Sequence, residues 1–354
     1  MTRILLPAIA AIGVASTTLV ALGAGTPGLP PRLDDYLTGE VNPTPEERAR
    51  LLAGEPVTRL LDVDESKEVA VVGAVWVDAP MHRYVDLVKD IEKFERGGGF
   101  TLTRRISATP RAEDFADMRM SDEDVAELRS CQVGNCKVKL DQRALERFQT
   151  EIDWNAPNHK RAVESLMRQL ALEYVTGYVE GGDDRLAIYR DKARPTFMAR
   201  EFREMLDAAP ELTRHMPLIR RYLLEYPRTT VGASNSFLYW QETQFGLKPT
   251  VRISHLVIRE GETETVIASK MLYANHYFWT GLELRVLLPD PTRGRGFWFV
   301  TIYRGRADGL SGFTGRLVRG RVRSEVQNGA LMGLKATKQM LGGAPKPAAG
   351  SGRP

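Results

Sequence analysis

The side chains that most often carry catalysis are few and scattered in this chain. Its five histidines are His82, His159, His215, His255 and His276, and no two of them have the spacing of a metal-binding pair on a helix. The sequence has no G-x-S-x-G nucleophile elbow, no P-loop and no H-E-x-x-H zinc motif. We therefore expect no metal site and no cofactor, and the sequence names no catalytic residue.

The densest group of polar and aromatic side chains is Lys-Met-Leu-Tyr-Ala-Asn-His-Tyr-Phe-Trp, from Lys270 to Trp279. A few polar groups among aromatic rings suit a pocket that orients a largely apolar molecule. Strand alternation places Lys270 and His276 on one face and Tyr273 on the other. Such residues are also often simply packed and hydrogen-bonded within a sheet. With one tryptophan of the following strand, the candidate ligand-binding residues are Lys270, Tyr273, His276, Trp279 and Trp298.

His276 could serve as an acid or a base if it were buried beside a carboxylate. Spacing along the chain identifies no such partner. An acid–base role for His276 therefore stays an alternative to pocket lining.

The only two cysteines, Cys131 and Cys136, flank the turn-forming sequence Gln-Val-Gly-Asn. Two cysteines are too few for a structural zinc site, and a C-x-x-C redox pair has a different spacing. In an exported protein, two close cysteines most simply form a disulfide that fixes a turn. Free thiols remain the alternative.

The last long apolar-periodic segment carries many cations. Arg316, Arg319, Arg321 and Arg323 are followed by Lys335 and Lys338, and Glu325 is the only acid among them. Such a basic amphipathic helix could contact anionic lipid headgroups through Arg316, Arg319 and Arg323. The alternative is a core helix whose arginines simply face water.

Two groups of elements must position these residues. Near the front, residues 68 to 77 alternate with apolar side chains on both faces, which predicts a strand buried on both sides or lining a cavity. After a predicted helix and Gly97-Gly-Gly99, a second strand is expected from Phe100 to Ile106. At the back, strands are expected at 250–259, 264–273, 277–288 and 296–303, the third of them half-buried. A helix is expected from Gly312 to Leu341.

Between these groups lies a block with mostly helical periodicity, from about residue 121 to 245. Its longest helix is expected from Pro157 to about Val179 and ends at Gly181-Gly182. The last helix of the block is expected from Ser234 to Phe245.

Composition and the chain ends set wider limits. The 354 residues leave room for one large domain or two ordinary ones, and a net charge of +4 is too small to indicate a nucleic-acid partner. Residues 1–24 are typical of a signal peptide, or of an N-terminal anchor if they are not cleaved. A proline-rich segment (25–66) follows, and residues 342–354 have the composition of a disordered tail.

The strand, Val77-Asp-Ala-Pro80 and helix near the front resemble the opening of SRPBCC or START-like helix-grip domains. The strands and long helix of residues 250–341 resemble the ending of these domains, and the sequence from Ile302 to Phe313 resembles the strand-to-helix junction of exported bacterial members. In that family a curved antiparallel sheet grips a C-terminal helix, and an apolar ligand binds between them. The resemblance implies an α+β, START-like domain at 67–341 with a helical insertion at about 121–245.

The main functional hypothesis is therefore an exported, periplasmic protein that binds or transfers an apolar small molecule or lipid. Peripheral contact with a membrane would accompany that role. Cyclases and dehydratases use the same fold, so an enzyme is one alternative. An envelope interaction protein whose insertion binds a partner is another.

Overall fold

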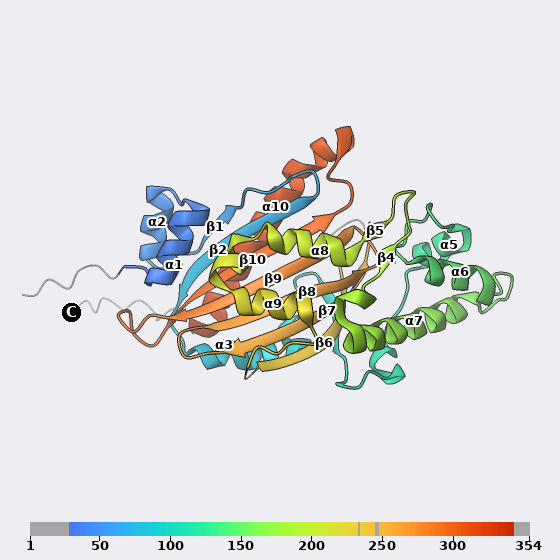
Figure 1. Cartoon of the computed structure of the whole chain (residues 1–354), viewed down its shortest axis with the longest axis horizontal. Coiled ribbons are helices and arrows are strands. Elements are labelled where there is room, and N and C mark those ends of the chain that lie inside the picture. The colour runs from blue at the N-terminus through green and yellow to red at the C-terminus, as the bar shows by residue number, and fades with distance from the viewer. Residues whose placement is uncertain (1–27, 233, 245–247, 343–354) are drawn as a thin grey trace, which may run out of the picture.

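The computed structural model describes residues 28–232, 234–244 and 248–342. The segment expected to be a signal peptide and the expected C-terminal tail beyond Gly342 lie outside the described residues. Within the described ranges the chain is α+β, with a large antiparallel sheet and a long helix after the last strand (Figure 1).

The sheet has eight strands in the order β1-β2-β10-β9-β8-β7-β6-β3, and every neighbouring pair is antiparallel. The first long strand of the chain therefore pairs with the last. The strands, in sheet order, are β1 Val57–Leu60, β2 Glu68–Val77, β10 Phe297–Ala307, β9 Phe278–Pro289, β8 Thr265–Ala274, β7 Thr250–Glu260, β6 Ser234–Thr243 and β3 Phe100–Arg105. The predicted strands at the front and the back of the chain are confirmed.

Strand β6 corrects the prediction of a helix from Ser234 to Phe245. All four residues of Phe237-Leu-Tyr-Trp240 are apolar or aromatic, so helical and strand periodicity fit this run equally well. Three aromatic rings in four residues favour a pleated strand between neighbours, and β6 lies between β3 and β7.

The helices fall into an N-terminal group, a pair after β2, a long inserted series and a C-terminal helix. The first groups are α1 Pro31–Tyr36, η1 Leu37–Val41, α2 Pro45–Leu52, α3 Met81–Lys89 and α4 Ile91–Phe94. The insertion between β3 and β6 contains η2 Ala112–Phe115, α5 Asp122–Ser130, α6 Gln142–Glu151, α7 His159–Gly181, η3 Gly182–Arg185, the small hairpin β4 Ile188–Tyr189 and β5 Thr196–Phe197, α8 Met198–Asp207, η4 Glu211–His215 and α9 Pro217–Glu225. The last helix is α10 Gly312–Gly342.

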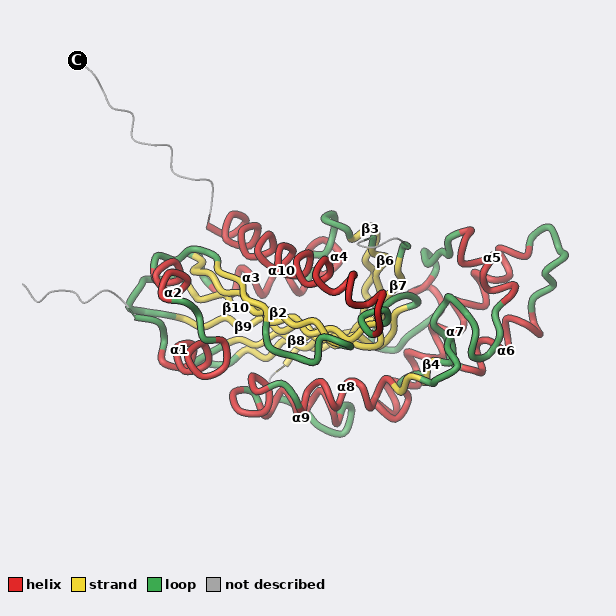
Figure 2. The backbone as a smooth tube through the Cα atoms, turned by 90° about the horizontal axis from the view of Figure 1, so that it is seen from above, coloured by secondary structure: helices red, strands yellow, loops and turns green. Residues whose placement is uncertain are grey.

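The sheet is covered on both faces (Figure 2). Helices α3, α4 and α10 lie on one side, which we call the α10 face, and their apolar residues pack with Val75, Phe299 and Leu287. Helices α1, α8 and α9 lie on the other side, the insertion face, and pack with Leu284 and Val300 among others. Helices α5, α6 and α7 continue past the end of the sheet.

Two buried arginines of β10 attach the insertion to its face of the sheet. Arg304 bonds Glu68 of β2 at 2.8 Å and also pairs with Glu211 of η4. Arg306 bonds Glu201 of α8 at 2.9 Å. Charges taken out of water are tolerated only when they are paired and hydrogen-bonded, so these contacts fix where α8 and η4 dock.

Coverage of both faces also corrects the prediction that β9 is half-buried. Leu284 packs under the insertion, while Leu287 packs on the α10 face. On that second face Arg285 is buried and bonds Glu95 at 3.1 Å. The charge of Arg285 suggested that this face of β9 is open to solvent. The fold instead buries the face and supplies the carboxylate of Glu95 as a partner.

Candidate ligand-binding site

Lys270 lies on the insertion face of β8 and is fully buried. Its ammonium pairs with the carboxylate of Asp183 in η3, donates to the carbonyl of Leu223 at 2.7 Å and lies over the Phe202 ring. Burial lowers the pKa of Lys270 and raises the pKa of Asp183, because both charged forms lose water. Lys270 therefore joins the insertion to the sheet, on the face opposite α10.

His255 stands opposite Lys270 across the β7–β8 pair and completes a buried polar group. Its Nδ1 is 2.9 Å from the Tyr178 hydroxyl, and its Nε2 is 2.7 Å from Oγ of Ser236. Burial and the charge of Lys270 lower the pKa of His255 to about 3. A serine hydroxyl beside an imidazole can act as a nucleophile, with the imidazole as its general base. So low a pKa makes His255 a poor base at neutral pH. No pattern in the sequence predicts this contact, because His255, Tyr178 and Ser236 lie on separate elements.

A β-bulge in β8 changes the predicted faces. The register shifts between Ile253 and Ser254, so that Lys270 pairs with His255 and Tyr273 with Ile253. His255 and Ile253 are two residues apart on β7, so Lys270 and Tyr273 share the insertion face instead of opposing each other. The Tyr273 hydroxyl donates to the carbonyl of Lys139 at 2.9 Å.

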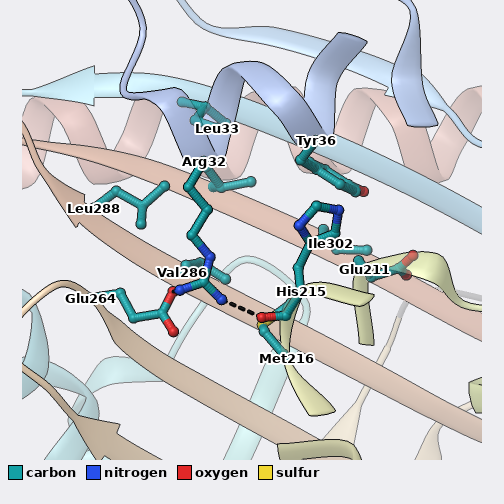
Figure 3. A pocket seen from close by; sticks show the side chains of 11 residues that line it. Arg32, Leu33, Tyr36, Glu211, His215, Met216, Glu264, Val286, Leu288 and Ile302 are labelled. Carbon is teal, nitrogen blue, oxygen red and sulfur yellow. Dashed lines mark hydrogen bonds and ion pairs between the residues drawn. The ribbon is translucent and has the colours of Figure 1, made fainter. Parts of the chain in front are cut away.

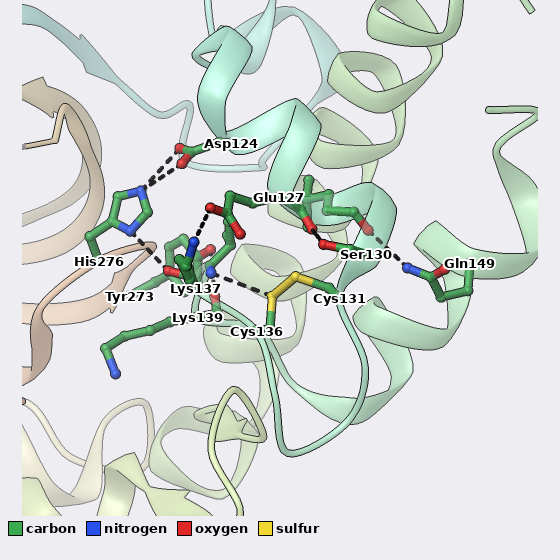
Figure 4. Close-up of a disulfide and its surroundings, with 12 residues drawn as sticks. Asp124, Glu127, Ser130, Cys131, Cys136, Lys137, Lys139, Gln149, Tyr273 and His276 are labelled. Carbon is green, nitrogen blue, oxygen red and sulfur yellow. Dashed lines mark hydrogen bonds and ion pairs between the residues drawn. A yellow bond between two sulfur atoms is a disulfide. The ribbon is translucent and has the colours of Figure 1, made fainter. Parts of the chain in front are cut away.

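His276 follows β8 and is buried against α5 (Figure 4). Its Nε2 is 3.0 Å from each carboxylate oxygen of Asp124, and its Nδ1 is 3.2 Å from the carbonyl of Lys137. Asp124 is the partner carboxylate that spacing did not identify. Both side chains are almost inaccessible to solvent, so the pair fastens the β8–β9 turn to the insertion.

The disulfide between Cys131 and Cys136 is confirmed, with Cα atoms 4.6 Å apart (Figure 4). The turn that it closes places Gly134 at a φ of +87°, which glycine adopts readily. The main-chain nitrogen of Cys136 donates to the carbonyl of Asp191 at 2.8 Å. The disulfide turn is therefore also bonded to the segment after β4.

Trp279 belongs to the junction between β10 and α10. Its Nε1 donates to Asp308 at 2.6 Å, and Lys192 pairs with Asp308 at 2.8 Å. The buried Lys139 pairs with Asp308 and with Asp191. Although burial alone raises the pKa of Asp308, the two lysines lower it. Asp308 thus ties the start of α10 to the disulfide turn.

Trp298 is fully buried on the insertion face of β10. Its Nε1 donates to Asp290 at 3.1 Å, and its ring meets Trp76 edge to face at 5.6 Å. Trp298 is therefore apart from Tyr273 and His276, which bond residues of the insertion near the disulfide, and from Trp279, which bonds Asp308. The five candidate ligand-binding residues do not surround one cavity.

Two small cavities lie between the sheet and the elements of its insertion side. One, of about 40 Å³, lies under α1, and Arg32 crosses it to pair with Glu264 at 2.8 Å (Figure 3). The other, of about 60 Å³, lies between α6, α7 and the sheet and includes Tyr273 in its lining. Ligand sites for drug-sized molecules usually measure a few hundred Å³ or more, so neither cavity encloses a lipid.

The space under α10 is different because the helix is held along only part of its length. Leu334 is fully buried, and it packs so closely on Gly73 of β2 that an added Cβ would lie 2.8 Å from its Cδ1. Val322 and Val326 stand on the same stripe of the helix, but they are only half-buried. On the neighbouring central strands the side chains of Tyr303 and Glu283 also remain partly exposed on this face.

The three arginines expected to contact lipid differ in their surroundings. Arg316 is exposed and Arg319 is half-buried. Arg323 turns inward and pairs with Glu65, in the connection between β1 and β2.

Comparisons with known proteins point to no further site. No protein-family model matches the chain, and no curated protein matches it. Among the described residues, no helix has the length and apolar character needed to cross a membrane. The same part of the chain contains no group of histidine, cysteine, aspartate and glutamate side chains suited to hold a metal ion.

Proposed function

We propose that this protein is an exported, START-like helix-grip protein that binds an apolar small molecule of the lipid class between the sheet and α10. The observation that carries the proposal is the half-open stripe of α10. Leu334 is closed against Gly73, whereas Val326 and Val322, about two and three turns nearer the start of the helix, leave apolar surface beside the sheet.

The topology supports the helix-grip assignment. Strands β2 and β10 are neighbours, and α10 packs across β1 and β2 near that edge, as expected for a C-terminal helix held against the sheet. The disulfide is compatible with an oxidising compartment, which supports export to the periplasm.

The alternatives receive less support. A cyclase- or dehydratase-type enzyme needs an accessible acid or base, and both His276 and His255 are buried in contacts with the insertion. An interaction protein that uses the insertion would have to bind its partner through α5, α6 and α7, which continue past the sheet, because α8 and α9 bury their apolar faces on the sheet.

The test is to extract the purified chain with organic solvent, identify what is released by mass spectrometry, and titrate the emptied protein with a fluorescent fatty acid. Val326→Asp places a charge on the stripe, and we expect it to weaken binding at least about tenfold, because a carboxylate would have to lose water beside the ligand. Met332→Asp is the matched control, since Met332 is exposed on the outer side of the same helix.

Two results would overturn the proposal. One is an extract without any lipid-class molecule, together with no uptake of the fluorescent acid. The other is equal binding by the wild type and Val326→Asp, which would place the ligand away from the stripe.

A further inference from the structure

The first turns of α10 extend past the sheet, at the upper right of Figure 1. The chain reaches this helix through Gly309 and Gly312, which adopt φ angles of +75° and +72°. Leu317 is 75% exposed and Val318 is 46% exposed. Large apolar side chains at the free end of a helix cost hydration free energy unless another surface covers them.

Cations surround these two apolar residues. Arg316 and Arg321 are exposed, Arg319 is half-buried, and none of the three forms an ion pair with another described residue. Arg323, by contrast, is neutralised by Glu65. The tip of α10, residues 316 to 321, therefore combines an apolar edge with unpaired positive charge.

We propose that the tip of α10 docks on the surface of an anionic lipid bilayer. Leu317 and Val318 would enter the boundary between headgroups and acyl chains, while Arg316 and Arg321 bond lipid phosphates. A second copy of this chain would bring the same cations together, and like charges repel, so charge complementarity favours an anionic surface. This docking needs no ligand under α10, so it stands or falls independently of the proposed function.

The experiment measures cosedimentation of the full chain with vesicles of phosphatidylcholine alone and of phosphatidylcholine mixed with phosphatidylglycerol. We expect binding to the anionic vesicles only, weakened by added salt. Arg316→Ala and Arg321→Ala should each reduce affinity about fivefold, and Leu317→Ser about tenfold or more.

Matched controls separate the tip from other surfaces. Leu218 of α9 is 57% exposed on the insertion side, so Leu218→Ser makes the same substitution at another largely exposed leucine and should leave vesicle binding unchanged. Arg323→Ala removes an arginine of the same helix that is already paired, and we expect no loss of affinity. Every variant keeps the same N-terminal segment, and circular dichroism checks that each is folded.

The proposal fails if both kinds of vesicle bind equally, or if Leu317→Ser binds as tightly as Leu218→Ser. It also fails if the chain ignores anionic vesicles but binds nucleic acid through Arg316 and Arg321, because the partner would then be a polyanion without an apolar layer.

Discussion

Buried ionisable residues decide how the insertion meets the sheet. Lys270 is paired with Asp183, and its neighbour His255 shares hydrogen bonds with Tyr178 and Ser236. A buried ion pair adds little net stability, but a mismatched one is costly. We therefore interpret these contacts as fixing the position of α7, η3 and α9 on the sheet.

His255 should make stability depend on pH. Its pKa is about 3 in the folded protein and near 6.5 when unfolded, so between these values the unfolded chain binds the extra proton. Stability from this residue is complete above the unfolded pKa and falls as the pH drops toward the folded pKa, by about 1.4 kcal/mol per pH unit. When the pH is lowered from about 7 to about 5, the free energy of unfolding measured in urea should fall by about 2 kcal/mol more for the wild type than for His255→Gln. Parallel pH profiles for the two proteins would contradict this.

Some contacts of single residues were predictable and others were not. The cysteine pair was, because both partners and the turn between them are neighbours in the chain. The partner of His276 was not, since Asp124 lies 152 positions away and only the fold brings them together. The face of Tyr273 was missed because one extra residue in a bulge reverses alternation without any change in composition.

At the scale of elements, α10 and the disulfide turn meet at Asp308. Lys139 and Lys192 bond this carboxylate, and the segment that carries Lys192 is bonded in turn to the disulfide turn. The segment that leads into α10 is therefore positioned by the insertion, whereas the second half of the helix is positioned by Gly73 and β1.

Removing the disulfide should destabilise the fold modestly. The cysteines are five positions apart, and closing so short a loop is worth about 2 kcal/mol in the chain-entropy model. We expect the Cys131→Ser, Cys136→Ser double variant to lose about this much free energy of unfolding in urea. A thiol reductant should cause the same loss in the wild type and none in the variant. A reductant effect that persists in the variant would show that the disulfide is not its cause.

The elements themselves were predictable where local periodicity is clear. Strands β7 to β10 alternate over long runs, and α10 follows a glycine-rich junction, so their positions were predicted closely. Strand β6 was not, because apolar residues on both faces erase the difference between the two periods. Its identity comes from pairing with β3, which lies more than a hundred residues earlier.

At the scale of the whole molecule, helices cover both faces of the sheet, and the insertion covers one of them. Apolar residues of β2, β8, β9 and β10 on the insertion face share one core with α1, α8 and α9. The sequence indicated a helical insertion at about 121–245, and periodicity alone does not report which face of the sheet its helices cover. In the structure, α8 and α9 occupy the face opposite α10.

This arrangement predicts the result of deleting residues 107–232 and joining β3 to β6 with a short glycine-serine linker. The deletion would expose the apolar insertion face and leave Arg304, Arg306 and Lys270 without Glu211, Glu201 and Asp183. Arg304 and Arg306 keep Glu68 and all three cations become open to water, so the main cost is the apolar surface of the insertion face that returns to water, at roughly 25 cal/mol per Å², against a domain stability of only about 5–15 kcal/mol. We expect an aggregating product without a cooperative thermal transition by circular dichroism. A soluble, cooperatively folding product would instead show that the sheet and α10 form a domain independent of the insertion.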